Sequence, residues 1–253
     1  MMYENYVSSG ICKKPTRQDT LDGMTELLLY NPTDRPSAIT MTVFFADRAP
    51  HTFEPVDLPA ESNRVLVMPD MERTVFEDCG FWGARFESTT PLVVILIDLV
   101  GALTNPCPDA AFKGGVTHFL GTKLHTQWHF ADGLWLDWKR FYHGDLGKAP
   151  FPYNELEYYY VLNPGPHDAQ VEMTLQYRHL DHATVLLSVP ARRVAVWCNY
   201  EQVPYNQPYG VKLLSTEPIA TTSVRYIYGL NGFADWGLNL HFGMPAEPGS
   251  ITA

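Results

Sequence analysis

Short runs in which apolar and polar residues alternate recur along this chain, as expected of β-strands with one buried face. The run AQVEMTLQY, residues 169–177, shows the pattern most clearly. One side of such a strand would carry Val171, Met173, Leu175 and Tyr177, and the other Glu172, Thr174 and Gln176. Turn sequences such as Asn-Pro-Gly-Pro at 163–166 separate the runs, because proline and glycine end a strand. The pattern predicts many short strands and little helix.

The pattern occurs twice. Residues 26–48 resemble residues 157–179, and the Asn-Pro pair at 31 aligns with the pair at 163, an offset of 132. FWGARFESTTP at 81–91 matches PYGVKLLSTEP at 208–218 at an offset of 127. We therefore predict an all-β protein of two tandem antiparallel β-sandwich domains related by internal duplication. The expected domains are residues 1–115, the more divergent copy, and residues 116–253, which end in a C-terminal tail.

The Ser-Thr-x-Pro motif shared by both copies is expected to lie between strands, where its hydroxyl groups can satisfy backbone groups. No G-x-S-x-G sequence surrounds either copy, so the motif does not indicate a catalytic serine.

The composition of the chain argues against several classes of function. The formal charge of −10 argues against binding to nucleic acid, which needs a basic surface. The longest apolar run, residues 91–103, is too short to cross a membrane, and no signal peptide opens the chain, so we expect no membrane insertion and a cytoplasmic location. The four cysteines have no CxxC spacing, so we expect reduced thiols and no cofactor.

Four blocks of the second half resemble, in order, the sensory rhodopsin transducer family. They are WHFADGLW at 128–135, YVLNPGPHDAQVEMTLQY at 160–177, VPARR at 189–193 and YGVKLLSTEPI at 209–219. The resemblance implies a non-enzymatic β-sandwich that forms oligomers, resembles carbohydrate-binding folds and acts by binding. The first half keeps the Asn-Pro turn but lacks a clear Trp-x-x-Ala-Asp-Gly opening and the paired arginines.

These differences favour the second half as the ligand-binding part. The expected ligand residues are Trp128, Asp132, Trp135, Arg192 and Arg193. Tryptophan faces can stack on sugar rings, and the planar guanidinium group suits a carboxylate or a sugar acid. An alternative is that the aromatic residues from Trp128 to Tyr160 form a domain or subunit interface. The ligand would be a small polar molecule such as a carbohydrate, or a protein partner of this binding or adaptor module.

A second function class remains open. His125 and His129 could bind a metal ion together with Asp132, and Glu157 or Asp137 could then act as acid or base in a carbohydrate-processing enzyme. No HExxH or H-x-H pattern supports the metal site, so surface histidines are the simpler interpretation.

Duplication also bears on assembly. A tandem pair can replace two subunits of a symmetric oligomer, so we expect a homodimer that presents four domains.

Overall fold

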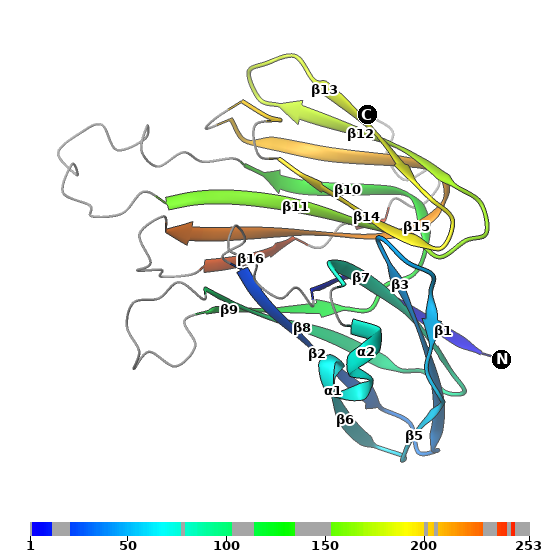
Figure 1. The fold of residues 1–253 in the computed structure, drawn as a ribbon. Helices are drawn as coiled ribbons and strands as arrows, with labels where there is room; N and C mark the ends of the chain where they lie inside the picture. The colour runs from blue at the N-terminus through cyan, green and yellow to red at the C-terminus, as the bar shows by residue number, and fades with distance from the viewer. Residues whose placement is uncertain are drawn as a thin grey trace.

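The computed structural model describes residues 2–11, 21–76, 79–102, 114–134, 153–199, 202–204, 207–229, 237–241 and 244–245. The fold is nearly all β, and the paired strands run antiparallel, which confirms the predicted fold class (Figure 1). No helix among the described residues has the length and apolar character needed to span a membrane.

The first half forms two sheets. Its elements are β1 (Tyr3–Ile11), β2 (Leu21–Asn31), β3 (Ser37–Phe45), β4 (His51–Thr52), β5 (Val56–Leu58), β6 (Ser62–Val67), α1 (Met68–Met71), α2 (Arg73–Phe76), β7 (Phe81–Ser88), β8 (Val93–Ala102) and β9 (Gly114–Leu120). One sheet has the order β1-β7-β3, with β4 and β5 both beside β3, and the other has the order β6-β2-β8-β9. Strand β9 crosses the predicted boundary at residues 115 and 116 and pairs with β8.

The second half repeats this arrangement. Its strands are β10 (His125–Gly133), β11 (Tyr153–Asn163), β12 (Ala169–Tyr177), β13 (Ala183–Val189), β14 (Arg193–Cys198), β15 (Tyr209–Gly229), β16 (Gly237–His241) and β17 (Met244–Pro245). The long strand β15 pairs first with β12 and β10, and from Ala220 onward with β11 and β16. One strand, β15, therefore makes the pairings that β7 and β8 share between them in the first half. The described pairings give the orders β10-β15-β12-β13 and β14-β11-β15-β16, which match β1-β7-β3-β5 and β6-β2-β8-β9.

The predicted alternation in β12 is confirmed, because Val171, Met173 and Leu175 are buried while Glu172 and Gln176 are exposed. Burial of every second side chain is what a strand at the surface of a sandwich requires.

One buried asparagine closes the same turn in each half. The side-chain amide of Asn31 donates to the carbonyl oxygens of Arg35 (2.7 Å), Leu58 (3.5 Å) and Pro59 (3.0 Å). The side-chain amide of Asn163 donates to the carbonyl oxygens of His167 (2.8 Å), Val189 (3.1 Å) and Pro190 (3.3 Å). Each asparagine thus joins the end of one strand to the loop that leads into another sheet.

The shared threonine also has a structural role. Thr89 Oγ1 accepts a hydrogen bond from the backbone N–H of Ala38 at 3.1 Å, and Thr216 Oγ1 accepts one from the backbone N–H of Gln170 at 3.0 Å. In the first half the Ser-Thr-x-Pro motif links β7 to β8, as predicted. In the second half it lies inside β15, where that strand passes from one sheet to the other.

The four sheets are stacked, with β14-β11-β15-β16 of the second half against β1-β7-β3 of the first (Figure 1). Leu162, Val194 and Ala220 pack on Tyr6 and Phe44 in this middle contact. A buried hydrogen bond of 2.7 Å also joins Ser8 Oγ to Thr222 Oγ1 across it. The middle contact leaves two end faces, on β13-β12-β15-β10 and on β6-β2-β8-β9.

Replacing Asn163 by alanine is expected to destabilise the protein by about 3 kcal/mol, because the buried Val189 carbonyl and two partly buried carbonyl groups lose their donor, and an unsatisfied buried group costs about 1–3 kcal/mol. Asn31→Ala should have a similar effect. Urea unfolding measures both losses. Gln202→Ala, at an exposed position between β14 and β15, is the control and should stay within about 0.5 kcal/mol of the parent protein. Equal stability of all three variants would contradict this role of the buried asparagines.

Candidate functional site

Trp128, a predicted ligand residue, is a core residue. Its side chain is 1% exposed, and its indole N–H lies 3.2 Å from the carbonyl oxygens of both His125 and Ile219. The equivalent first-half residue is Asn5, whose amide donates to the Leu92 carbonyl at 3.2 Å. Because neither face of the Trp128 ring reaches the surface, the structure argues against stacking of a sugar on it.

The paired arginines lie at the start of β14. Arg192 is exposed, and its φ of 58° matches the φ of 47° at Glu61, the equivalent turn residue of the first half. Its backbone N–H donates to the Gly165 carbonyl, so the turn fixes its backbone. Arg193 is half-buried and donates to the Arg192 carbonyl at 3.0 Å. Arg193 also helps Arg48 to lower the pKa of the Asp47 carboxyl, which places it near the first half.

The remaining predicted residues are described only in part. Asp132 belongs to β10, but its side chain is not described. Trp135 and Asp137 lie outside the described residues. The predicted ligand site as a whole stays a prediction.

The two histidines of β10 make separate contacts. His125 packs its ring edge-on against Trp128, with ring centroids 5.4 Å apart. His129 Nε2 lies 2.8 Å from Gln127 Nε2, and burial, followed by the charge of Lys212, lowers the pKa of His129. Within the described part of the chain, no group of three histidine, cysteine or acidic side chains is placed to hold a metal ion.

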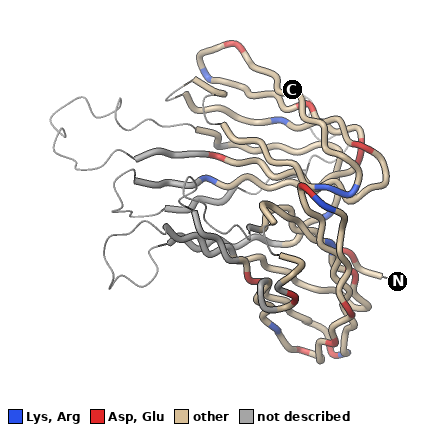
Figure 2. The backbone as a smooth tube through the Cα atoms, in the orientation of Figure 1, with Lys and Arg blue, Asp and Glu red and all other residues tan. Residues whose placement is uncertain are grey.

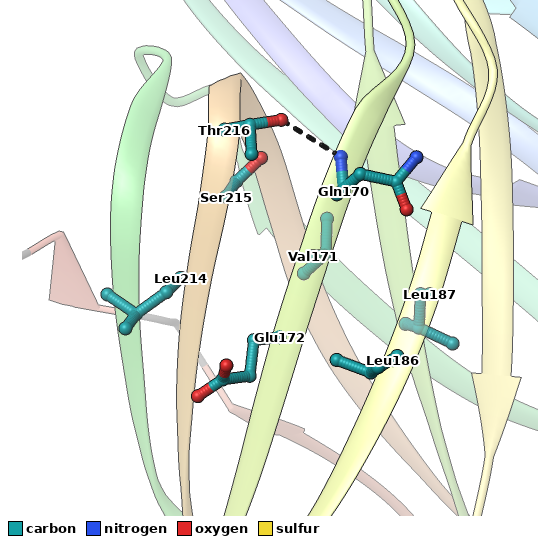
Figure 3. Close-up of a pocket in the computed structure, with 8 residues that line it drawn as sticks. All are labelled: Gln170, Val171, Glu172, Leu186, Leu187, Leu214, Ser215 and Thr216. Atoms are coloured by element: carbon teal, nitrogen blue, oxygen red, sulfur yellow. Dashed lines mark hydrogen bonds between the residues drawn. The ribbon is translucent and has the colours of Figure 1, made fainter.

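A surface pocket of about 370 Å³ lies on the outer face of the β13-β12-β15-β10 sheet. It is lined by Gln170, Val171, Glu172, Leu186, Leu187, Leu214, Ser215 and Thr216 (Figure 3). Strand register builds it: Glu172 of β12 stands opposite Leu186 of β13 on one side and Leu214 of β15 on the other. We call this surface, with its pocket, the β12 face.

The β12 face carries both apolar and polar side chains that are exposed to solvent. Leu186 is 78% exposed and Leu214 is 36% exposed, and both lie in the middle of strands. Glu172 lies between them and has no hydrogen-bond or ion-pair partner among the described residues. Beside it, the side-chain amide of Gln170 donates to Ser188 Oγ at 3.1 Å. Such a surface offers an apolar platform with a carboxylate acceptor at its centre.

A second polar cluster is buried inside the second sandwich, around Glu157. The Tyr209 hydroxyl donates to Glu157 Oε2 at 2.7 Å and accepts from Asn199 Nδ2 at 3.1 Å. Asn199 also donates to the Leu134 carbonyl, so the cluster ties the residue that follows β10 to β14 and β15. Arg225 Nη2 lies 3.7 Å from Glu157 Oε1.

Burial controls the charge of this cluster. Glu157 is fully buried, and the loss of solvation raises the pKa of its carboxyl to about 7, although the Tyr209 hydrogen bond and the Arg225 charge act in the opposite direction. Burial also raises the pKa of the Tyr159 and Tyr209 hydroxyls, and the neighbouring Glu157 adds to the effect.

At the described equivalent positions the first half carries different residues. Strand pairing matches Glu157 with Thr25 and Tyr209 with Trp82, and the residue that follows β14, Asn199, matches Met68. Glu157 was a candidate acid or base from the sequence, but its partners Tyr209, Asn199 and Arg225 were not expected. A comparison of the two copies, with polar residues in the second where the first has Trp82 and Met68, was the available signal. Glu157 is fully buried and contacts Tyr209 and Arg225, which supports a structural role.

Comparison with known proteins finds only weak structural similarity. No family model matches the chain, and no curated protein matches it. Thermotoga maritima 1070 is 17% identical, with 47% of this chain and 93% of that chain covered and a TM-score of 0.37. The Anabaena sensory rhodopsin transducer is 25% identical, with 39% of this chain and 94% of that chain covered and a TM-score of 0.31. The predicted family thus has a weak structural neighbour here, and membership stays a prediction.

The buried carboxyl predicts a specific pH dependence. Because the pKa of Glu157 is about 7 in the folded chain and near the ordinary carboxyl value of 4.5 when unfolded, the folded state binds the proton more tightly. This group therefore lowers the free energy of unfolding as pH rises from about 4.5 to about 7, on the order of 3 kcal/mol at about 1.4 kcal/mol per pKa unit. Glu157→Gln should remove that fall in urea unfolding series between pH 5 and pH 8.

Glu172→Gln is the matched control, since it removes one exposed carboxylate from the same half. It should retain the pH dependence of the parent protein. A Glu157→Gln protein with an unchanged pH dependence would contradict the raised pKa.

Proposed function

We propose that this chain is a non-enzymatic binding protein whose β12 face holds a small neutral carbohydrate. The observation that carries the proposal is the row Leu186, Glu172 and Leu214, which exposes two apolar side chains on either side of a carboxylate that has no partner among the described residues. The C–H groups of a sugar ring can pack on leucines, and its hydroxyl groups can donate to the carboxylate. Gln170 and Ser188 add amide and hydroxyl groups beside them.

Charge selects the ligand class. Glu172 is the acidic group at the centre of the pocket, and the whole chain carries a formal charge of −10. Both disfavour an anion, so a neutral sugar fits the β12 face better than the sugar acid expected from Arg192 and Arg193. A protein partner would meet the same exposed leucines, and the experiment below includes that outcome.

The enzyme alternative receives no support from the described residues. It needs His125, His129 and Asp132 around one ion, whereas His125 contacts Trp128 and His129 contacts Gln127. Glu157, its expected acid or base, is buried under Tyr209 and Arg225.

The proposal includes an origin by tandem duplication. It is supported by the matching strand orders, by the two buried asparagines and by the two positive-φ turn residues. Duplication would leave one copy free to specialise. The outer face of β1-β7-β3 is covered by the other half, whereas the equivalent β12 face is open.

Binding to a panel of neutral hexoses and their short oligomers, measured by calorimetry on the full chain, tests the proposal. Leu186→Ala, Leu214→Ala and Glu172→Gln should each weaken binding about tenfold or more, because a hydrogen bond to a charged group or a buried apolar contact is worth about 1.5–3 kcal/mol. Their melting temperatures should stay close to that of the parent protein, since the changed side chains are exposed.

Leu180→Ala is the matched control, because Leu180 is 46% exposed and lies outside the pocket. It should bind as the parent protein does. Arg192→Ala separates the two candidate sites: loss of binding in this variant but not in Glu172→Gln would favour the predicted arginine site. If no sugar binds, the carbohydrate proposal fails and a protein partner becomes the better explanation of the leucines.

A further inference from the structure

The opposite end of the stack carries an exposed apolar face. The outward positions of β2, β6 and β8 hold mostly apolar residues, which are Leu28, Tyr30, Val65, Val67, Val93, Ile95 and Ile97. We call this surface the β2 face. Tyr30 is 39% exposed and Val65 is 51% exposed. Among the described outward positions of these three strands, Glu26 alone is charged.

The same face is an interface in the second half of the chain. Strand pairing matches Leu28, Tyr30 and Val93 with Tyr160, Leu162 and Ala220. These three second-half residues are all 0% exposed, because the first half covers them. The β2 face is thus as apolar as a surface that the chain buries elsewhere. Its exposure in a single copy is the unusual feature, since contiguous apolar patches on monomers are small.

The two ends of the stack do not suit each other. In the middle contact, Tyr6 and Phe44 cover the apolar sheet. Their equivalents on the β12 face are His129 and Gln176, which are polar. A head-to-tail contact between copies would place these polar groups against Leu28 and Tyr30, and would bury them without partners. Contact between two copies of the β2 face buries apolar groups on both sides.

Charge agrees with this choice. Each chain has a formal charge of −10, so two copies repel each other except where their surfaces carry little charge. Figure 2 shows Asp, Glu, Lys and Arg both at turns and along strands, with uncharged stretches between them. The described part of the β2 face is such an uncharged surface, apart from Glu26.

We infer that the β2 face binds the β2 face of a second copy of this chain. The contact uses the same patch on both partners, so it closes as a two-fold dimer and leaves both β12 faces open at the far ends. This inference places the predicted homodimer on a defined surface, and it does not depend on the identity of any ligand.

Light scattering coupled to gel filtration tests it on the full chain. The parent protein should have twice the chain mass of 28.6 kDa at about 50 μM protein, well above the Kd of a stable dimer of about 1 μM or tighter. Val65→Glu and Tyr30→Glu should reduce the mass to that of one chain, because each would bury a charge in the contact. Both side chains are exposed in one copy, so the variants should keep the circular dichroism of a β protein.

Leu186→Glu is the matched control, because it places the same charge at an exposed position on the opposite end face. It should leave the dimer intact. A parent protein with the mass of one chain would overturn the inference. So would a dimer that survives both Val65→Glu and Tyr30→Glu. Loss of the dimer in Leu186→Glu would instead indicate head-to-tail contact and would also overturn it.

Discussion

Leu162 packs among Tyr6, Phe44 and Val194 where the inner sheets of the two halves meet, and the exposed surfaces of the protein follow from this contact. Each sandwich buries a core of its own. The middle contact covers one further face of each sandwich, so only the two end faces of the stack remain available. One of them is polar with two exposed leucines, and the other is apolar. This difference leads to separate proposals for ligand binding and for association of two copies.

Local structure could be predicted from the sequence where it depends on a short run of neighbouring residues. Alternation in residues 169–177 predicted the buried side of β12. The paired Asn-Pro turns identified Asn31 and Asn163, whose side chains make matching hydrogen bonds in the structure. Such features depend on a few neighbouring residues and on backbone geometry, which the sequence carries directly.

The site could not be predicted in the same way. Trp128 was expected at a ligand surface, but a strand exposes alternate side chains, and which side faces the core depends on the partner sheets. Here Phe130, two residues along, is also buried, and His129 faces outward. Glu157 and Tyr209 are 52 residues apart in the chain and come together only through the fold. Likewise, the β12 face depends on the register of three strands.

We infer that the middle contact joins the two halves into one cooperative structure. Hydrogen exchange of the full chain tests this with Leu162→Ala, a change that removes a buried side chain from the contact at a cost of about 2–5 kcal/mol. Leu175→Ala, in the core of the second sandwich alone, is the comparison. Leu162→Ala should lower amide protection in β1 and β7 as well as in β11 and β14. Loss of protection confined to the second half, as expected of Leu175→Ala, would contradict it.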